Sequence, residues 1–361
     1  MPATRTLHDL GQSVWLDNIT RDLLDSGTLK RYIDDLAVTG LTSNPSIFEQ
    51  ALKGSAAYDD AIRDGVRAGR SGEPLFFDLA IADLTRAADL FRPVYARTNG
   101  VDGWVSLEVS PLLAHDTALT LQAATELFAR TDRPNLHIKI PGTKEGILAI
   151  EATIFAGIPV NVTLLFSCEQ YLAAAEAWLR GVERRIAAGL DPDIRSVASV
   201  FVSRWDVAAA PLVPAHMRNQ LGLAMAGRIY AAVRALHASP RWQRVLNAGA
   251  RPQRVLWAST GTKDPAAPDG LYVQALASPY TVNTIPEKTL LAFADHGEVG
   301  TLMADDGVAA EHVIADHVKA GVDITAMATQ LQDDGAQAFV KSWHALLDGL
   351  QRKAATITAV R

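Results

Sequence analysis

The sequence predicts a (β/α)8 barrel of the α/β class, a closed ring of eight parallel strands in which a helix follows each strand. The 361 residues are 48% hydrophobic and 20% charged, which is typical of a globular protein and long enough for one large barrel. Eight short β-branched segments alternate with longer segments of helical periodicity, and this alternation indicates parallel pairing. No Gly/Ser-rich or Pro-rich linker divides the sequence. We therefore expect one domain over residues 1–361, with the barrel core at about 10–300 and additional helices at about 301–361.

The predicted strands are short, rich in β-branched residues and bounded by turn signals. They are Ser13–Asp17, Ala37–Ser43, Gly103–Val109, Leu136–Ile140, Val160–Leu164, Ser196–Val202, Arg254–Ser259 and Thr281–Ile285.

The predicted helices have apolar residues every three to four positions. Within the barrel they include Leu75–Leu90, Ala118–Ala129, Gly146–Phe155, Glu169–Ala188 and Met217–Leu236. The helical stretch 203–250 predicts an inserted helix pair. Two C-terminal helices are expected at Met303–Lys319 and Val322–Leu347.

Composition excludes several classes of function. The net charge of −6 gives no reason to expect nucleic acid or an anionic membrane as a partner. No stretch approaches the ~20 apolar residues of a membrane span, and the first residues lack a signal core, so we expect a cytoplasmic protein. The single cysteine, Cys168, excludes an internal disulfide and is expected to be a small buried hydrophobe. The nine histidines show no metal-ligand spacing, and no dinucleotide or Walker A motif is present.

Residue parity sorts each strand into two faces, because side chains alternate along it. In the fourth strand Lys139 shares a face with His137, and in the fifth Thr163 lies opposite Leu164. The apolar face must meet the surrounding helices, so the polar face points into the barrel. Charged groups there cost several kcal/mol unless they are paired or hydrated, which predicts a functional site at the strand ends. The inward polar residues are Asp17, Asn44, Glu108, Lys139, Thr163, Ser199 and Ser259.

Lys139 is the central candidate. It lies between two isoleucines in LHIKIP, so it should be largely buried. Burial disfavours an ammonium ion and lowers its pKa, and a neutral amine can attack a carbonyl to form a Schiff base. Asp17 and Glu108 would stabilise the ammonium if both were ionised, so we expect at least one of them to share a proton or to sit one water away. A buried ion pair without catalysis is the alternative.

The other candidates each have a functional and a purely structural interpretation. Asp17 and Glu108 are expected to act as a general acid/base pair, but Asp17 alone could cap a following helix and Glu108 could be a satisfied ion pair. Asn44 precedes Pro45 and could simply cap a helix. Thr163 could position a water or bond to the backbone.

A phosphate site is suggested by Arg204, which follows the sixth strand, and by Ser259 with Lys263 after the seventh. Barrels often hold phosphate at small and Gly-rich residues in this region. The guanidinium would supply two parallel hydrogen bonds and the ammonium a flexible point charge. Both cations could instead be solvated loop charges.

These residues lie in segments that resemble the transaldolases, the Schiff-base enzymes of the pentose phosphate pathway. The run Thr281–His296 resembles the longer, actinobacterial-type members, and the whole resemblance covers roughly residues 10–300. Its main segments are Trp15–Thr20 (WLDNIT), Thr39–Phe48 (TGLTSNPSIF), Leu136–Thr143 (LHIKIPGT) and Gly157–Ser167 (GIPVNVTLLFS).

The resemblance implies transfer of a three-carbon dihydroxyacetone unit between sugar phosphates, without metal or organic cofactor. Sedoheptulose 7-phosphate and glyceraldehyde 3-phosphate would give erythrose 4-phosphate and fructose 6-phosphate. Lys139 matches the Schiff-base lysine, Asp17 the acid/base aspartate and Glu108 the glutamate of the third strand. Thr163 matches a threonine that helps to hold a catalytic water. The residues expected to bind substrate are Thr42, Asn44, Ser199, Phe201, Arg204, Ser259 and Lys263.

The sequence departs from the better-known members at two places. Val200 and Ser203 stand where those members usually have proline and glycine. Gly261 stands where they have an arginine, and Lys263 follows it. Arg204 is therefore the expected phosphate ligand, and Lys263 is a candidate for the second phosphate-binding charge.

Two other functions stay open at this point. A lyase would use the same barrel to release free dihydroxyacetone, as fructose-6-phosphate aldolase-like relatives do. A non-catalytic barrel would only bind sugar phosphates. The expected partners are sugar phosphates, and the chain is expected to be a monomer or a homodimer.

Overall fold

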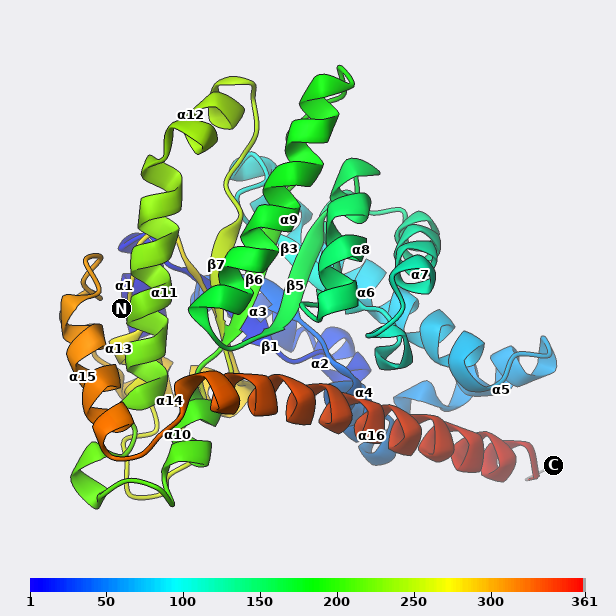
Figure 1. The fold of residues 1–361 in the computed structure, drawn as a ribbon. Coiled ribbons are helices and arrows are strands. Elements are labelled where there is room, and N and C mark those ends of the chain that lie inside the picture. The colour runs from blue at the N-terminus through cyan, green and yellow to red at the C-terminus, as the bar shows by residue number, and fades with distance from the viewer. Residues whose placement is uncertain (360–361) are drawn as a thin grey trace.

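Eight parallel strands form a closed barrel in the order of the sequence (Figure 1). The computed structural model describes residues 1–359. Each strand pairs with the next, and the eighth returns to pair with the first. Helices alternate with the strands around the outside of this ring, so the predicted fold class is confirmed.

Every predicted strand is present, with each end within one residue of its expected position. The segments carry the β-branched and aromatic residues that suit a pleated, buried surface. The strands are β1 (Ser13–Asp17), β2 (Val38–Thr42), β3 (Trp104–Glu108), β4 (Leu136–Pro141), β5 (Val160–Leu165), β6 (Ser196–Phe201), β7 (Arg254–Ala258) and β8 (Val282–Ile285).

The helices that surround the barrel include all five that periodicity predicts, each somewhat shifted or extended at its ends. Up to β6 the α-helices are α1 (Ala3–Asp9), α2 (Arg21–Asp25), α3 (Thr28–Asp35), α4 (Pro45–Gly54), α5 (Asp59–Arg67), α6 (Gly72–Arg97), α7 (Thr117–Thr131), α8 (Lys144–Phe155) and α9 (Cys168–Ala187). After β6 they are α10 (Ser203–Ala209), α11 (Leu221–Ala238), α12 (Pro240–Asn247), α13 (Leu271–Ala275), α14 (Glu287–His296), α15 (Val308–Lys319) and α16 (Ile324–Ala359). Short 3-10 turns lie at Ala56–Tyr58, Pro111–Leu113 and Ala215–Met217.

The prediction of an inserted helix pair at 203–250 is wrong. The segment contains three α-helices, and α11 packs against α9 and β7, where the crossover helix of the sixth unit belongs. Pro240 separates α11 from α12, because its ring cannot continue the preceding helix while it suits the first turn of the next. The segment is therefore the crossover itself with two short helices beside it.

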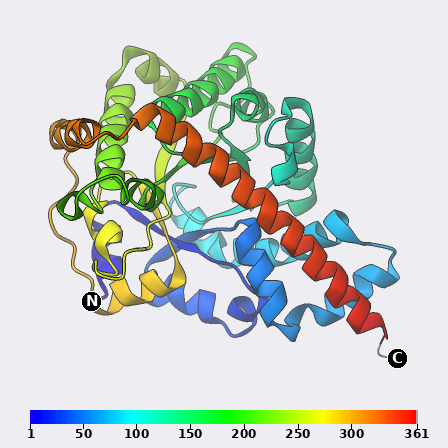
Figure 2. The same ribbon diagram turned by 60° about the horizontal axis from the view of Figure 1, so that its bottom comes forward.

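The two C-terminal helices are present, but their ends differ from the prediction. The first begins at Val308 rather than at Met303, because Gly307 has a left-handed backbone with a φ of 70° at its N-cap. The second continues to Ala359, beyond the predicted end at Leu347. Their arrangement matters for the site, since α16 runs diagonally across one end of the barrel (Figure 2).

Near the end of β5 the predicted alternation of side chains fails. Leu164 has a left-handed backbone with a φ of 59°, and the pairing with β6 is irregular between Val162 and Leu165. Leu165 therefore joins Val162 in the outer core, whereas Leu164 packs against α16 at Gly335. The prediction that Leu164 shares the outward face is wrong because a bulge shifts the strand's parity by one residue.

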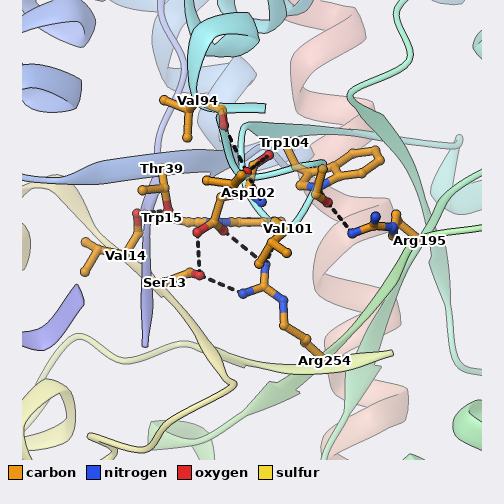
Figure 3. Close-up of polar contacts among 12 residues, drawn as sticks. Ser13, Val14, Trp15, Thr39, Val94, Val101, Asp102, Trp104, Arg195 and Arg254 are labelled. Carbon is orange, nitrogen blue, oxygen red and sulfur yellow. Dashed lines mark hydrogen bonds and ion pairs between the residues drawn. The ribbon is translucent and has the colours of Figure 1, made fainter. Parts of the chain in front are cut away.

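The opposite end of the barrel is filled by rings and a buried ion pair. The His137 ring stacks on that of Trp104 with a centroid distance of 4.1 Å, and burial lowers its pKa far below the usual range. Asp102 accepts hydrogen bonds from Ser13 at 2.8 Å and from Arg254 at 3.0 Å, and Arg254 also donates to the Ser13 hydroxyl (Figure 3). These contacts join β1, β7 and the loop before β3, so they close the barrel at this end.

Removing one partner of this ion pair should destabilise the fold. Arg254→Met leaves the Asp102 carboxylate, whose side chain is 6% exposed, without its cation, and we expect a loss of about 3 kcal/mol. Thermal unfolding followed by circular dichroism should show a melting temperature several degrees lower. The matched control is Arg251→Met, because Arg251 forms only an exposed 3.8 Å pair with Asp193. Equal melting temperatures for both variants would contradict a structural role for the buried pair.

Candidate active site

A cavity of about 220 Å³ opens at the carboxyl ends of the strands, on the side that α16 crosses (Figure 2). Side chains converge there from every strand except β3, from the helices α4, α10 and α16, and from the loops that follow the strands. Barrel enzymes keep their active sites at this end. The cavity is lined by Asp17, Thr42, Asn44, Ser46, Lys139, Thr163, Ser199, Phe201, Arg204, Ala258, Ser259, Lys263, Thr284, Pro286 and Phe339.

Lys139 lies on β4 with its ammonium group at the cavity wall and only 4% of its surface exposed. Its Nζ atom donates a hydrogen bond of 3.1 Å to the carbonyl oxygen of Ser43 and lies 3.2 Å from Oε2 of Glu108. The register of β3 and β4 causes this approach, since Glu108 and Lys139 are directly paired. The amine thus has an acidic neighbour and an open side toward the cavity.

The carboxyl of Glu108 is buried at the end of β3, behind the amine. Burial raises its pKa, and the attraction of Lys139 opposes this rise. Apart from the contact with Lys139, its oxygens have no hydrogen-bond partner within residues 1–359. The ion pair that the structural alternative expects is thus present, and the carboxyl still has capacity to bind a further donor or to hold a proton.

Thr163 lies at the cavity wall on β5. Its hydroxyl is fully buried and has no hydrogen-bond partner among the described residues. The alternative expectation, that it bonds to the backbone, is wrong. The backbone around it is nevertheless fixed, because its carbonyl accepts a 2.7 Å hydrogen bond from the Gly142 amide after β4. A small polar molecule in the cavity could therefore bond to this hydroxyl.

Asp17 ends β1 and is half-buried at the cavity wall. Burial raises the pKa of its carboxyl, while Lys139 and a hydrogen bond from Thr42 lower it. That hydrogen bond is 2.8 Å long, and the Thr42 hydroxyl also lies 2.6 Å from that of Thr284. Asp17 does not cap a helix, because α2 begins at Arg21 and is capped by Thr20. The carboxyl is thus left free for chemistry inside the cavity.

Asn44 caps a helix and also lies in the wall of the cavity. Its side-chain oxygen accepts a 3.1 Å hydrogen bond from the amide of Ile47 and so caps α4. The same residue also lines the cavity, where its amide NH₂ is available to a ligand. The helix cap therefore fixes the orientation of a cavity-lining side chain.

A chain of hydrogen bonds forms the floor beside Lys139. The hydroxyl of Ser199 on β6 donates to Asn161 on β5 at 2.7 Å, and the Asn161 amide donates to Ser106 on β3 at 3.1 Å. Asn161 is fully buried, so these bonds satisfy polar groups that would otherwise be costly inside the barrel. They also hold Ser199 against the cavity.

One end of the cavity is positively charged. The guanidinium of Arg204 lies 4.9 Å from the ring centroid of Phe201. Burial lowers the pKa of Arg204, and Asp17 opposes this effect. Lys263 belongs to the same wall, so the two cations face one space. This arrangement suits a phosphate group.

Ser259 lines the same cavity as the two cations and is fixed by its backbone and by its neighbour Ser203. Its φ of 56° lies in the left-handed region, a strained conformation of the kind that clusters at functional sites. Its hydroxyl lies 2.9 Å from that of Ser203, and its carbonyl accepts a hydrogen bond from the Ser203 amide. Ser203 therefore orients Ser259, which follows β7.

Lys263 occupies space that Gly261 leaves open. A Cβ atom placed on Gly261 would lie 3.9 Å from Nζ of Lys263. The side chain of Lys263 is exposed toward solvent, in contrast to Arg204, so this wall of the cavity has one partly buried and one exposed cation.

Metal binding and thiol chemistry were the other two possibilities among the described residues. Among residues 1–359, no three His, Cys, Asp or Glu side chains are close enough together to hold a metal ion. Cys168 starts α9 and packs against the core, and burial raises the pKa of its thiol to about 11. No helix in the described part of the chain combines the length and apolar character needed to cross a membrane.

The comparison with known protein families agrees with the chemistry that the cavity residues suggest. A family model described as transaldolase/fructose-6-phosphate aldolase matches residues 14–350. The chain belongs to this family. A protein named transaldolase from Thermobifida fusca (strain YX) is 46% identical over 362 residues, with 98% of each chain covered. One from Parafrankia sp. (strain EAN1pec) is 43% identical, covering 97% of this chain and 98% of the relative. A protein named transaldolase 2 from Nostoc sp. (strain PCC 7120 / SAG 25.82 / UTEX 2576) is 38% identical, again with 98% of both covered.

In this transaldolase/fructose-6-phosphate aldolase family member, the fold brings all eleven sequence-predicted site residues to one cavity. Ten line it directly, and Glu108 contacts the lysine from behind. Sequence reasoning missed the other five lining residues, Ser46, Ala258, Thr284, Pro286 and Phe339. Parity along β8 could have found Thr284, which lies two residues from the inward Val282. No local signal identified Phe339, because it comes from the distant helix α16.

Proposed function

We propose that this protein is a transaldolase that transfers a dihydroxyacetone unit from a ketose phosphate to an aldose phosphate. The observation that carries the proposal is a buried amine, that of Lys139, 3.2 Å from a buried carboxyl and in one cavity with Asp17. A cationic wall at the same cavity suits the phosphate of a sugar. The relatives' names support the same reaction.

The first step is the formation of a Schiff base. The neutral amine of Lys139 attacks the C2 carbonyl of the ketose, and the carbonyl oxygen becomes the hydroxyl of a carbinolamine. Loss of this hydroxyl as water leaves an iminium ion. Glu108, with its raised pKa, supplies the proton that the leaving water needs, through a water bonded to the Thr163 hydroxyl.

The second step breaks a carbon–carbon bond. Asp17 takes the proton of the C4 hydroxyl, the C4 oxygen forms a carbonyl, and the electrons of the C3–C4 bond move into the iminium. The aldose phosphate leaves, and an enamine of dihydroxyacetone stays on Lys139. An acceptor aldehyde reverses these steps, which predicts ping-pong kinetics.

The phosphate of donor or acceptor binds between Arg204 and Lys263. Lys263→Ala should weaken this binding roughly 10- to 100-fold, the usual worth of a hydrogen bond to a charged group. We expect KM to rise for fructose 6-phosphate, whereas KM for unphosphorylated fructose should change little. Lys288→Ala, a lysine of α14 that lies outside the cavity lining, is the matched control. An unchanged KM for the phosphorylated sugar would remove Lys263 from the phosphate site.

A lyase is the second candidate, because the matched family model is described by both activities. In a lyase, water intercepts the intermediate and dihydroxyacetone is released. The test supplies fructose 6-phosphate with and without erythrose 4-phosphate and measures dihydroxyacetone and sedoheptulose 7-phosphate. Acceptor-dependent turnover supports the transaldolase, and acceptor-independent release supports the lyase. Sugar-phosphate binding without turnover would contradict both enzymes.

A further inference from the structure

Phe339 is the one aromatic residue that α16 contributes to the lining of the cavity. Its ring centroid lies 5.7 Å from Nζ of Lys139, and the residue is 5% exposed. The remaining wall around the amine is mostly polar, with Asp17, Thr163 and Ser199 among its members. An apolar ring thus faces the amine from outside the barrel, across the mouth.

Several contacts fix this ring relative to the amine. Gln332 on α16 donates hydrogen bonds to the carbonyls of Gly142 at 3.1 Å and Leu164 at 2.9 Å. Gly142 follows the strand that carries Lys139, and Leu164 follows Thr163 on β5. The hydroxyls of Ser342 and Ser46 lie 2.8 Å apart on the other side of Phe339. Figure 2 shows how the helix spans the end of the barrel.

The approach of the helix is close because its facing residue is small. A Cβ atom on Gly335 would lie 2.9 Å from the Leu164 side chain and 3.3 Å from the Arg204 guanidinium, so a larger residue would have to displace one of these side chains or α16 itself. Gly335 is one helical turn before Phe339, on the same face of the helix. The sequence of α16 therefore places an apolar ring at the mouth of the cavity and allows it to come close to the amine of Lys139.

We propose that Phe339 shields the covalent intermediate on Lys139 from water, and so directs it toward transfer rather than release. This inference rests on the proposed function. The ring excludes solvent at the nitrogen, where the dihydroxyacetone enamine waits for an aldehyde. Phe339 takes no proton and forms no bond, so it determines specificity between two acceptors, water and aldehyde.

The competing reaction is hydrolysis of the adduct. A proton adds to C3 of the enamine and restores the iminium. Water then adds to C2 and loses a proton, which gives a carbinolamine. The C2–N bond breaks with its electron pair on nitrogen, the amine takes up a proton, and the C2 hydroxyl gives its proton back as the carbonyl re-forms. Dihydroxyacetone leaves and the free lysine is regenerated.

The test is the ratio of dihydroxyacetone released to sedoheptulose 7-phosphate formed, at fixed fructose 6-phosphate and erythrose 4-phosphate. Phe339→Ala opens the mouth, and we expect this ratio to rise roughly tenfold. Phe339→Leu keeps an apolar group over the amine, so its ratio should stay close to that of the parent protein. Leu346→Ala on α16 is the control, because Leu346 is buried in the helix's core contact away from the cavity.

The outcomes separate this inference from its alternatives. An unchanged ratio in Phe339→Ala, or an equal rise in Leu346→Ala, would overturn it. An equal rise in Phe339→Leu would also overturn it, because attraction between the ring and a cationic nitrogen would then explain the effect. If Phe339→Ala does not fold, Phe339→Val gives the same test with a smaller opening. A parent protein that forms no adduct and transfers nothing contradicts the proposed function itself.

Discussion

Lys139→Met is expected to abolish trapping of the donor and to lower the transfer rate by roughly 10⁴-fold or more, the scale on which an enzyme responds to loss of its nucleophile. Methionine keeps the length of the side chain but cannot form a Schiff base. Borohydride added with fructose 6-phosphate should reduce the iminium of the parent protein, and mass spectrometry should find a three-carbon adduct on Lys139. The variant should show no adduct.

The control for this experiment is Lys144→Met, which removes an exposed lysine at the start of α8. It should retain both adduct and turnover. A three-carbon adduct that persists in Lys139→Met would place the nucleophile elsewhere and contradict the mechanism.

Folding of the Lys139→Met variant can be checked independently, because the change leaves Glu108 without its cation. A carboxyl whose pKa burial raises takes up a proton rather than staying ionised there. A proton held more tightly in the folded state stabilises the fold at acidic pH, and this stabilisation is lost as the pH rises through the folded pKa. The melting temperature of the variant relative to that of the parent should therefore be higher at pH 5 than at pH 8.

Strand positions and much of the site could be predicted because both depend on local patterns. Each strand has its own β-branched run between turn signals, and a closed barrel has no edge at which pairing can slip. Glu108 and Lys139 are charged residues in buried strands. Charges there are costly unless they are paired or hydrated, so their presence predicts a function. Parallel strands end at one side of the barrel, so inward residues at strand ends had to meet.

Features that depend on long-range packing could not be predicted. The apolar stripe of α16 includes Gly335, Phe339 and Trp343, which helical periodicity treats alike. In the fold Phe339 faces the cavity, while Trp343 packs on Phe76 with a ring distance of 4.9 Å. Only the path of the helix across the mouth distinguishes them.

Backbone irregularities were equally invisible in the sequence. The left-handed conformation of Leu164 occurs in a β-rich run without glycine, so parity misplaced that side chain. Its carbonyl is fixed by Gln332 of α16, a partner far away in the chain. Thr163, which comes just before the bulge, keeps the inward position that parity predicts and lines the cavity. Strain of this kind is held by surroundings rather than by local preference.

Asp17→Asn is expected to lower kcat/KM by roughly 10²- to 10⁴-fold, the usual contribution of a general base. The amide oxygen can still accept the hydrogen bond from Thr42, so the side chain should keep its place. What is lost is the ability to take the C4 hydroxyl proton. Schiff-base formation needs no such transfer to Asp17, so borohydride trapping of the donor should persist. Loss of trapping together with transfer would assign Asp17 to the earlier step.

The same variant should gain stability at alkaline pH, because burial raises the pKa of the Asp17 carboxyl in the folded protein. Below the unfolded pKa of about 3.9 the carboxyl is protonated in both states and costs nothing. As the pH rises from the unfolded pKa toward the raised folded pKa, the half-buried carboxyl makes the folded state less stable, whereas asparagine stays neutral. The melting temperature of Asp17→Asn should therefore exceed that of the parent most at pH 8 and least at pH 5. Asp64→Asn, at an exposed carboxylate on α5, should change neither activity nor melting temperature. A gain that grows toward acidic pH would mean that ionised Asp17 stabilises the fold. That result would contradict the expectation that the protein loses stability at position 17 in exchange for a general base.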